Sequence, residues 1–237
     1  MKVMILAGGF GSRISDVDQD IPKPMIILDD KPIIEHIINI YRNYRLKKFI
    51  ILTGYKHSIV KKFFIKNSKR FSDCEINIFN TGINTLTGSR ILKARKFIKE
   101  ENFIVTYGDG LSDIDIDKLI KFHKKSNNIG TITAVRPPAR FGELLIQSNM
   151  ITRFNEKIQL NKNWINGGFF VFKKDFFNLI PKKNTMLETF PIQNLIKIKS
   201  LNAYKHPGYW QCIDNRRDLN SVKNLIIEGN TPWIKKS

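Results

Sequence analysis

The sequence predicts an α/β fold with a mixed, mainly parallel sheet and helices on both of its faces. Two observations predict it. Short apolar runs, such as Val3–Ala7 and Phe103–Tyr107, alternate along the chain with longer amphipathic segments. These runs are almost uninterrupted by polar residues, which is typical of strands that helices cover on both faces. We therefore expect strand and helix to alternate through most of the chain.

The first part of the chain alternates most regularly. Val3–Ala7 reads as a buried strand, and Pro32 begins an amphipathic helix over Pro32–Tyr41, because proline is tolerated in a first helical turn. A second buried strand, Phe49–Thr53, is closed by Gly54. Further helices are predicted at Ile59–Ile65, Gly88–Glu100 and Asp117–Lys125, and further strands at Ile76–Phe79, Phe103–Tyr107 and Thr131–Val135.

The later part is less regular. Glu143–Ile146 and Ile151–Phe154 are predicted to form a hairpin around Ser148 and Asn149. Gly168–Phe172 reads as a core strand, and the aromatic residues Trp164, Phe169, Phe170, Phe172, Phe176 and Phe177 are expected in the core. Helices are predicted at Phe190–Lys197 and Leu219–Glu228, and a strand at Leu201–His206. We find no repeat, low-complexity tract or linker, and expect one domain over residues 1–237.

The charge balance is strongly basic, with a formal net charge of +19 over 237 residues. The basic residues are mostly lysines spread along the chain, which favours a solvated surface over a nucleic-acid footprint. Apolar runs stay far below the roughly 18 residues of a membrane span, and the first run is too short for a signal peptide. Cys74 and Cys212 lack metal-ligand spacing. We expect a cytoplasmic protein with reduced thiols and no membrane or nucleic-acid partner.

A glycine-rich loop directly follows the first strand. Gly8, Gly9 and Gly11 allow backbone N–H groups to approach an anion closely, and ligands of open α/β sheets bind beyond the carboxyl ends of strands. Arg13 and the proline-flanked Lys23 add positive charge. The loop is neither a Walker A motif nor a dinucleotide fingerprint. It predicts a phosphate-binding loop, and a glycine-rich turn without ligand is the alternative.

A carboxylate follows another predicted strand. Asp109 lies between Gly108 and Gly110 at the end of Phe103–Tyr107, where an α/β sheet presents catalytic groups. Carboxylate oxygens suit a hard cation such as Mg²⁺. An ordinary Asp-Gly turn is the alternative.

These motifs together resemble those of a known family. L-A-G-G-x-G-[ST]-R followed by P-K-P-M resembles the signature of the sugar-1-phosphate nucleotidylyltransferases, and TYGDG, RPPARFG, INGGFFVF and YKHPGYWQCID look most like its glucose-1-phosphate cytidylyltransferase branch. The resemblance implies a Rossmann-like fold of the nucleotide-diphospho-sugar transferase type and a homo-oligomer. It also implies an Mg²⁺-dependent reaction in which CTP and a sugar 1-phosphate, glucose 1-phosphate above all, give CDP-glucose and pyrophosphate.

The resemblance also implies the site residues. Arg13, Lys23 and Asp109 would be catalytic, and Asp109 and Asp214 would bind the metal. Nucleotide-binding residues would be Leu6, Ala7, Gly8, Gly9, Gly11, Ser12, Arg13, Lys23, Thr87, Gly88 and Arg90. Sugar phosphate-binding residues would be Gly142, Glu156, Lys157, Asn166 and Gly167. Thr87 could also cap the helix that follows it, and Glu156 with Lys157 could be an exposed ion pair.

The chain departs from the family pattern at a few positions. Only Asn80–Leu86 separates the strand Ile76–Phe79 from the T-G-S-R turn, Ser89 stands where glycine is usual, and Ile158 stands where proline is usual. The base, the sugar and the oligomeric state therefore stay open. The alternatives are another nucleotide, another phosphorylated sugar or polyol, a non-catalytic nucleotide-binding protein, or a basic nucleic-acid-binding protein.

Overall fold

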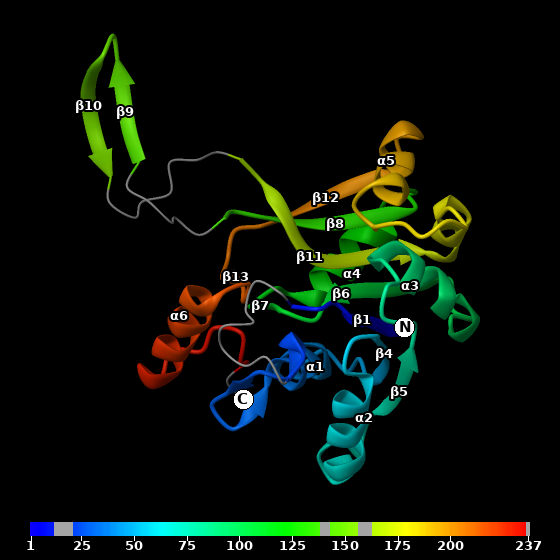
Figure 1. The fold of residues 1–237 in the computed structure, drawn as a ribbon. Coiled ribbons are helices and arrows are strands. Elements are labelled where there is room, and N and C mark those ends of the chain that lie inside the picture. Colours follow the sequence, from blue (N-terminus) through cyan, green and yellow to red (C-terminus); the bar gives the residue numbers. More distant parts are fainter. Residues whose placement is uncertain (12–20, 138–142, 156–162, 236–237) are drawn as a thin grey trace.

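The fold is built on one central sheet. A computed structural model describes residues 1–11, 21–137, 143–155 and 163–235. The sheet has seven strands in the order β12-β8-β11-β6-β1-β4-β5 (Figure 1). Their bounds are β12 Leu201–His206, β8 Gly130–Val135, β11 Ile165–Lys173, β6 Asn102–Tyr107, β1 Val3–Ala7, β4 Lys48–Thr53 and β5 Glu75–Asn80. Only β11 among these runs antiparallel to its neighbours, which confirms the mixed, mainly parallel sheet.

Helices cover both faces of this sheet. All five residues of β1 are buried, and they alternate between two hydrophobic clusters, with Val3 and Ile5 in one and Met4 and Leu6 in the other. Such alternation is what the two-residue period of a strand dictates. The first cluster lies under the helices α1 Ile33–Arg42, α2 His57–Lys66, α4 Ile116–Lys125 and α6 Arg216–Ile227. The second lies under α3 Thr87–Lys93, the 3-10 helix η5 Lys174–Leu179 and α5 Phe190–Lys197.

Short elements complete the body and connect the segment after β6 to the segment before α6. β7 Gly110–Ser112 pairs antiparallel with β13 Trp210–Cys212, and the Ile213 N–H donates to the Asp109 carbonyl at 2.9 Å. The chain after β6 is thereby tied to the chain before α6. The remaining short elements are β2 Ile27–Leu28, β3 Lys31–Pro32, and the 3-10 helices η2 Lys23–Met25, η3 Ser68–Phe71 and η4 Ala94–Phe97.

A hairpin of β9 Glu143–Gln147 and β10 Met150–Asn155 stands away from this body (Figure 1). Its turn has positive φ at Ser148 (46°) and Asn149 (73°), as a tight two-residue hairpin turn requires. The predicted hairpin and its turn are confirmed. Its apolar side chains are exposed, including Ile146 and Met150.

Two predictions need correction. The helix predicted over Gly88–Glu100 ends at Lys93 and continues as η4 only to Phe97, because Ile98 becomes extended and buries its side chain in the core. Trp164 is not a core residue: it is half-buried, and the guanidinium carbon of Arg136 lies 3.9 Å from its ring centroid. The phenylalanines grouped with it are buried as expected. Within the described residues, no helix is long and apolar enough to cross a membrane.

Candidate functional site

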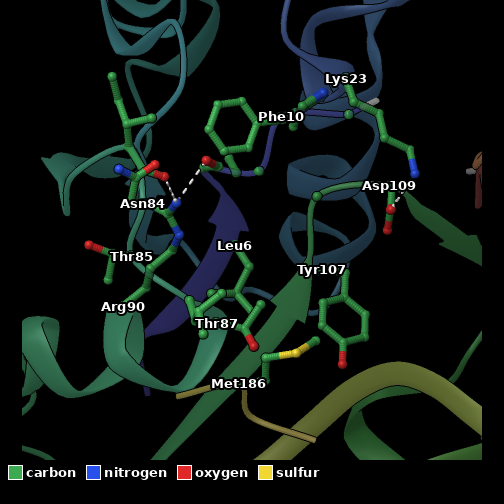
Figure 2. A pocket seen from close by; sticks show the side chains of 18 of the residues that line it. Leu6, Phe10, Lys23, Asn84, Thr85, Thr87, Arg90, Tyr107, Asp109 and Met186 are labelled. Atoms are coloured by element: carbon green, nitrogen blue, oxygen red, sulfur yellow. Dashed lines mark hydrogen bonds and ion pairs between the residues drawn. The ribbon is translucent and has the colours of Figure 1, made fainter. Parts of the chain in front are cut away.

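A cavity of about 590 Å³ opens at the carboxyl ends of β1 and β6 (Figure 2). Much of the predicted site lines it: Leu6, Ala7, Gly8, Gly9, Gly11, Lys23, Thr87, Arg90, Asp109 and Asp214. Its other lining residues are Phe10, Pro24, Ile83, Asn84, Thr85, Leu86, Tyr107, Gly108 and Met186. The structure thus brings the glycine loop, the proline-flanked lysine and both predicted metal carboxylates to one cavity.

The structural reason for glycine differs between positions 8, 9 and 11 of the loop. A Cβ on Gly8 would lie within 3.0 Å of Arg90 guanidinium atoms, so the protein itself needs glycine there. Gly11 has a φ of 66°, a conformation that glycine adopts without steric cost. Gly9 has neither constraint, since a Cβ there would meet nothing within 4 Å. Nothing in the described part of the chain therefore requires glycine at position 9.

Lys23 lies between the two predicted metal ligands. Its ammonium nitrogen is 2.7 Å from Oδ2 of Asp109 and 2.8 Å from Oδ1 of Asp214. Pro22 is extended and Pro24 is buried, so the backbone around the lysine is fixed at the start of η2. Asp109 follows β6 and Asp214 follows β13. Asp109 is therefore not merely part of a turn, because its carboxylate faces the cavity and pairs with a cation.

Burial and the neighbouring charges shift the pKa values of Lys23 and Cys212 in this cluster. Burial alone would lower the pKa of Lys23, but the charge of Asp109 and the hydrogen bonds to both carboxylates outweigh it and raise that pKa. The lysine is therefore protonated at neutral pH. Burial and Asp109 raise the pKa of the neighbouring Cys212 thiol to about 12, so Cys212 is a neutral thiol and not a thiolate nucleophile.

The two carboxylates fit a magnesium ion by their chemistry. Mg²⁺ prefers oxygen ligands and is commonly held by one or two carboxylates together with substrate phosphates and water. Asp109 and Asp214 supply that number of carboxylates at the edge of the cavity. Among the described residues no group of three or more potential metal-ligating side chains occurs, so a fully protein-made metal cage is not found in that part of the chain.

The T-G-S-R turn packs against the segment 184–188. A Cβ on Gly88 would lie 3.1 Å from the Thr185 carbonyl oxygen, so the close approach at Gly88 is to the protein's own backbone. The Thr87 hydroxyl accepts from the Leu187 N–H at 2.7 Å and donates to Glu188 at 3.1 Å. Thr87 does not cap α3, whose first turn has no side-chain cap.

One predicted sugar-side residue, Asn166, is linked to this segment through Tyr107. The Asn166 amide donates to the Tyr107 hydroxyl at 3.2 Å, and that hydroxyl donates to Glu188. Burial and the adjacent Glu188 raise the pKa of Tyr107, which keeps its hydroxyl protonated. The Gly167 carbonyl accepts from the Trp210 indole at 2.7 Å. Asn166 and Gly167 are not among the residues that line the cavity.

Sequence reasoning missed several residues at this site. Tyr107, Met186 and Phe10 line the cavity, and Glu188 joins Thr87 to Tyr107. The sequence showed Tyr107 as the last residue of a predicted strand and as part of the TYGDG motif, but gave it no role in the site. Glu188 lies in a segment without periodicity. The predicted site residues Ser12, Arg13, Gly142, Glu156 and Lys157 lie outside the described residues.

Comparison with solved structures defines the class of protein first. HddC from Yersinia pseudotuberculosis superposes with a TM-score of 0.75 at 25% identity, covering 95% of this chain and 99% of that one, and it is also known in complex with GMP-PN. A UDP-glucose pyrophosphorylase in complex with UDP-glucose shares the fold, with a TM-score of 0.74 at 18% identity over 96% and 98% of the two chains. The fold is that of the nucleotide-diphospho-sugar transferases.

Sequence comparison then gives the family. Residues 2–227 match the family described as nucleotidyl transferase. The glucose-1-phosphate cytidylyltransferases of Salmonella typhi and Salmonella typhimurium are each 36% identical over 253 residues, covering 98% of this chain and 98% of each relative. A D-glycero-alpha-D-manno-heptose 1-phosphate guanylyltransferase of Campylobacter jejuni is 30% identical over 84% of this chain and 89% of the relative. The chain belongs to the nucleotidyl transferase family and is a sugar-1-phosphate nucleotidyltransferase of the glucose-1-phosphate cytidylyltransferase type.

Proposed function

We propose that the protein transfers a cytidylyl group from CTP to glucose 1-phosphate, releasing pyrophosphate and CDP-glucose in an Mg²⁺-dependent reaction. The observation that carries the chemistry is the position of Lys23, between Asp109 and Asp214 on the same cavity as the glycine loop. The choice of CTP and glucose 1-phosphate is supported by relatives of that name at 36% identity over nearly the whole chain.

The reaction needs positioning and charge neutralisation more than a protein nucleophile. A phosphate oxygen of the sugar 1-phosphate attacks the α-phosphorus of CTP, and the bond from that phosphorus to the bridging oxygen of the β-phosphate breaks. Pyrophosphate leaves with that bonding pair. The N–H groups of the loop Gly8–Gly11 would bind the nucleotide phosphates, and Lys23 would neutralise the charge that gathers at the α-phosphate. Arg13 would contribute a further cation.

Asp109 and Asp214 would hold the magnesium ion. When bound, such an ion neutralises phosphate charge and orients phosphate oxygens. The two carboxylates come from distant segments of the chain and are held near each other by the β7–β13 pairing. Lys23 pairs with both, so the lysine also fixes the orientation of the carboxylates.

The sugar phosphate would bind beside the same cavity. We place its hydroxyl groups near Asn166 and the Tyr107–Glu188 pair, since these supply amide, hydroxyl and carboxylate groups next to the cavity wall. Gly167, Gly142, Glu156 and Lys157 complete this proposed subsite, with Lys157 as a phosphate contact.

The experiment is a substrate panel. Pyrophosphate release is measured with Mg²⁺ for CTP, UTP, dTTP, ATP and GTP, each with glucose 1-phosphate and other sugar 1-phosphates. We expect turnover with CTP and glucose 1-phosphate to exceed the other pairs by at least tenfold. Preference for a different pair would overturn the substrate assignment, and the heptose guanylyltransferase among the relatives makes GTP a necessary member of the panel. Failure of every pair would overturn the activity.

We also propose that residues 1–237 form one domain that assembles as a homo-oligomer in the cytoplasm. The hairpin β9–β10 supports the assembly, because it stands away from the body with exposed apolar side chains (Figure 1). Light scattering of the purified protein tests the assembly, and a monomeric mass at micromolar concentration would contradict it.

A further inference from the structure

Arg90 is buried below the glycine loop and contacts oxygen atoms from several segments. It is 3% exposed and lies in α3. Its Nη2 donates to the carbonyls of Gly8 at 2.8 Å and Ile83 at 3.1 Å. Its Nη1 donates to the carbonyls of Thr53 at 2.9 Å and Gly82 at 2.9 Å, and to the Thr81 hydroxyl. One side chain thus joins the last residue of β4 to the segments that follow β1 and β5, as Figure 2 shows in part.

These contacts use the donors at the end of the side chain. The two Nη atoms carry four hydrogens, and the structure gives them five oxygen acceptors, all of them on the protein. Arg90 therefore has no Nη hydrogen to spare for a nucleotide while this arrangement holds. The direct nucleotide contact that the family resemblance implies would therefore not use the Nη atoms in this arrangement.

Among the described residues, no carboxylate compensates the charge of Arg90. Every acceptor that the structure gives its Nη atoms is a neutral carbonyl or hydroxyl oxygen. A guanidinium stays protonated even when buried, and charge buried without a partner is destabilising. A polyanion bound in the adjacent cavity is a natural partner for that charge.

Two glycines make room for the guanidinium. A Cβ on Gly54 would lie 2.5 Å from Nη1 of Arg90, and a Cβ on Gly8 would lie 2.9 Å from its Nε. Real Cβ atoms essentially never come that close. Gly8 belongs to the signature loop, so one of the signature glycines is required by an arginine 82 positions later in the chain.

We propose that Arg90 is a positioning residue of the nucleotide site, which anchors the Gly8 carbonyl and supplies a fixed positive charge beneath the loop without touching substrate. Because the Gly8 carbonyl is held by Arg90 and by the Tyr55 N–H, the loop backbone is fixed and the N–H groups that follow stay available for phosphate. This inference rests on the proposed function. It assigns Arg90 to the nucleotide alone and not to the sugar phosphate.

The test compares Arg90→Met and Arg90→Lys with the wild type and with Lys93→Met. Lys93 lies on the same helix and donates to the Thr81 carbonyl at 2.7 Å, so it is a matched cation that does not reach the glycine loop. For each variant we would measure the Kd of CTP by calorimetry, KM for CTP and for glucose 1-phosphate, kcat, and urea unfolding.

Arg90→Met is expected to weaken CTP binding and raise its KM at least tenfold, with kcat at saturating CTP and KM for glucose 1-phosphate within threefold. Arg90→Lys keeps the charge and is expected to recover part of the CTP affinity. Lys93→Met is expected to bind CTP like the wild type. A merely structural role would lower the unfolding midpoint without separating the two substrates.

If Arg90→Met does not fold, Gly8→Ala tests the same inference. The new methyl group is expected to displace the guanidinium and weaken CTP binding. Equal changes in both KM values, unchanged CTP affinity in the Arg90 variants, or unchanged CTP affinity in Gly8→Ala would overturn the inference. A wild-type protein without any turnover would instead overturn the proposed function.

Discussion

The ammonium nitrogen of Lys23 lies 2.7 Å from Oδ2 of Asp109, although 86 residues separate them in sequence. The same nitrogen lies 2.8 Å from Oδ1 of Asp214, 191 residues away. Three distant segments therefore meet at one charged cluster on the wall of the cavity. The short helix η2 brings the lysine, the segment after β6 brings one carboxylate, and the segment after β13 brings the other.

Lys23→Met is expected to lower kcat by roughly 10²–10³, about 3–4 kcal/mol of transition-state stabilisation, because an oriented cation at the reacting phosphate is lost. Steady-state pyrophosphate release measures it. Lys31→Met is the matched control, since Lys31 forms an exposed ion pair with Asp30 at 3.0 Å. Full turnover of the Lys23 variant would remove this lysine from the catalytic assignment.

Asp109→Asn and Asp214→Asn are expected to raise the Mg²⁺ concentration for half-maximal activity at least tenfold, because an amide oxygen is a weaker ligand for a hard cation than a carboxylate. Titration with Mn²⁺ followed by electron paramagnetic resonance measures metal binding directly. Asp117→Asn, at the exposed first turn of α4, is the control. Unchanged Mn²⁺ affinity in both site variants would show that the metal is held elsewhere.

Gly9→Ala is expected to leave the free energy of unfolding unchanged or raise it by at most about 1 kcal/mol, because a Cβ there meets nothing within 4 Å. The same variant is expected to weaken CTP binding at least tenfold, since the methyl group would occupy space that phosphate needs. Gly11→Ala, at a φ of 66°, is expected to cost about 1–2 kcal/mol of stability instead. Calorimetry and urea unfolding separate the two effects, and wild-type CTP affinity in Gly9→Ala would contradict the phosphate-loop assignment.

His123 gives a pH dependence of stability. It is fully buried between Thr131 and Asn102, with ring-nitrogen contacts of 2.8 and 3.1 Å. Burial, together with the nearby charges of Lys173 and Lys124, lowers its pKa from 6.5 to about 4. The unfolded chain therefore binds more protons between these values, so the contribution of His123 is complete above pH 6.5 and is lost as the pH falls towards 4. The loss amounts to about 3 kcal/mol at most.

Urea unfolding of the wild type and of His123→Gln between pH 4 and 7 tests this. The variant is expected to be less stable at pH 7 but to lose less stability on acidification. Burial lowers the pKa of His36 as well, so a smaller slope of the same sign is expected to remain. An identical slope in both proteins would show that His123 does not titrate in this range.

The strands and most helices were predictable because burial on both faces leaves apolar runs. β1 is an example, with all five residues buried. The end of α3 was not predictable, because Lys93 is followed by residues with ordinary helix propensity and tertiary packing of Ile98 decides where the helix stops. Trp164 was misplaced because an aromatic residue beside a core strand can equally stack with a cation such as Arg136.

The site residues that lie in short sequence motifs were predictable from the sequence. Lys23 between two prolines and Asp109 between two glycines were visible in the sequence and lie together in the structure. The position of Glu188 was not visible, since its contact with Tyr107 depends on how the segment 184–188 packs on α3. The reason for Gly8 was also hidden, because the space it leaves is filled by the Arg90 side chain from the helix α3.

The central claim is that a phosphate oxygen of glucose 1-phosphate attacks the α-phosphorus of CTP. The most direct measurement is to incubate the protein with CTP, Mg²⁺ and glucose 1-phosphate labelled with ³²P, and to separate the products. We expect all transferred label in CDP-glucose and none in pyrophosphate, with one pyrophosphate for each nucleotide sugar. Label in pyrophosphate, or pyrophosphate released without a labelled nucleotide sugar, would contradict it.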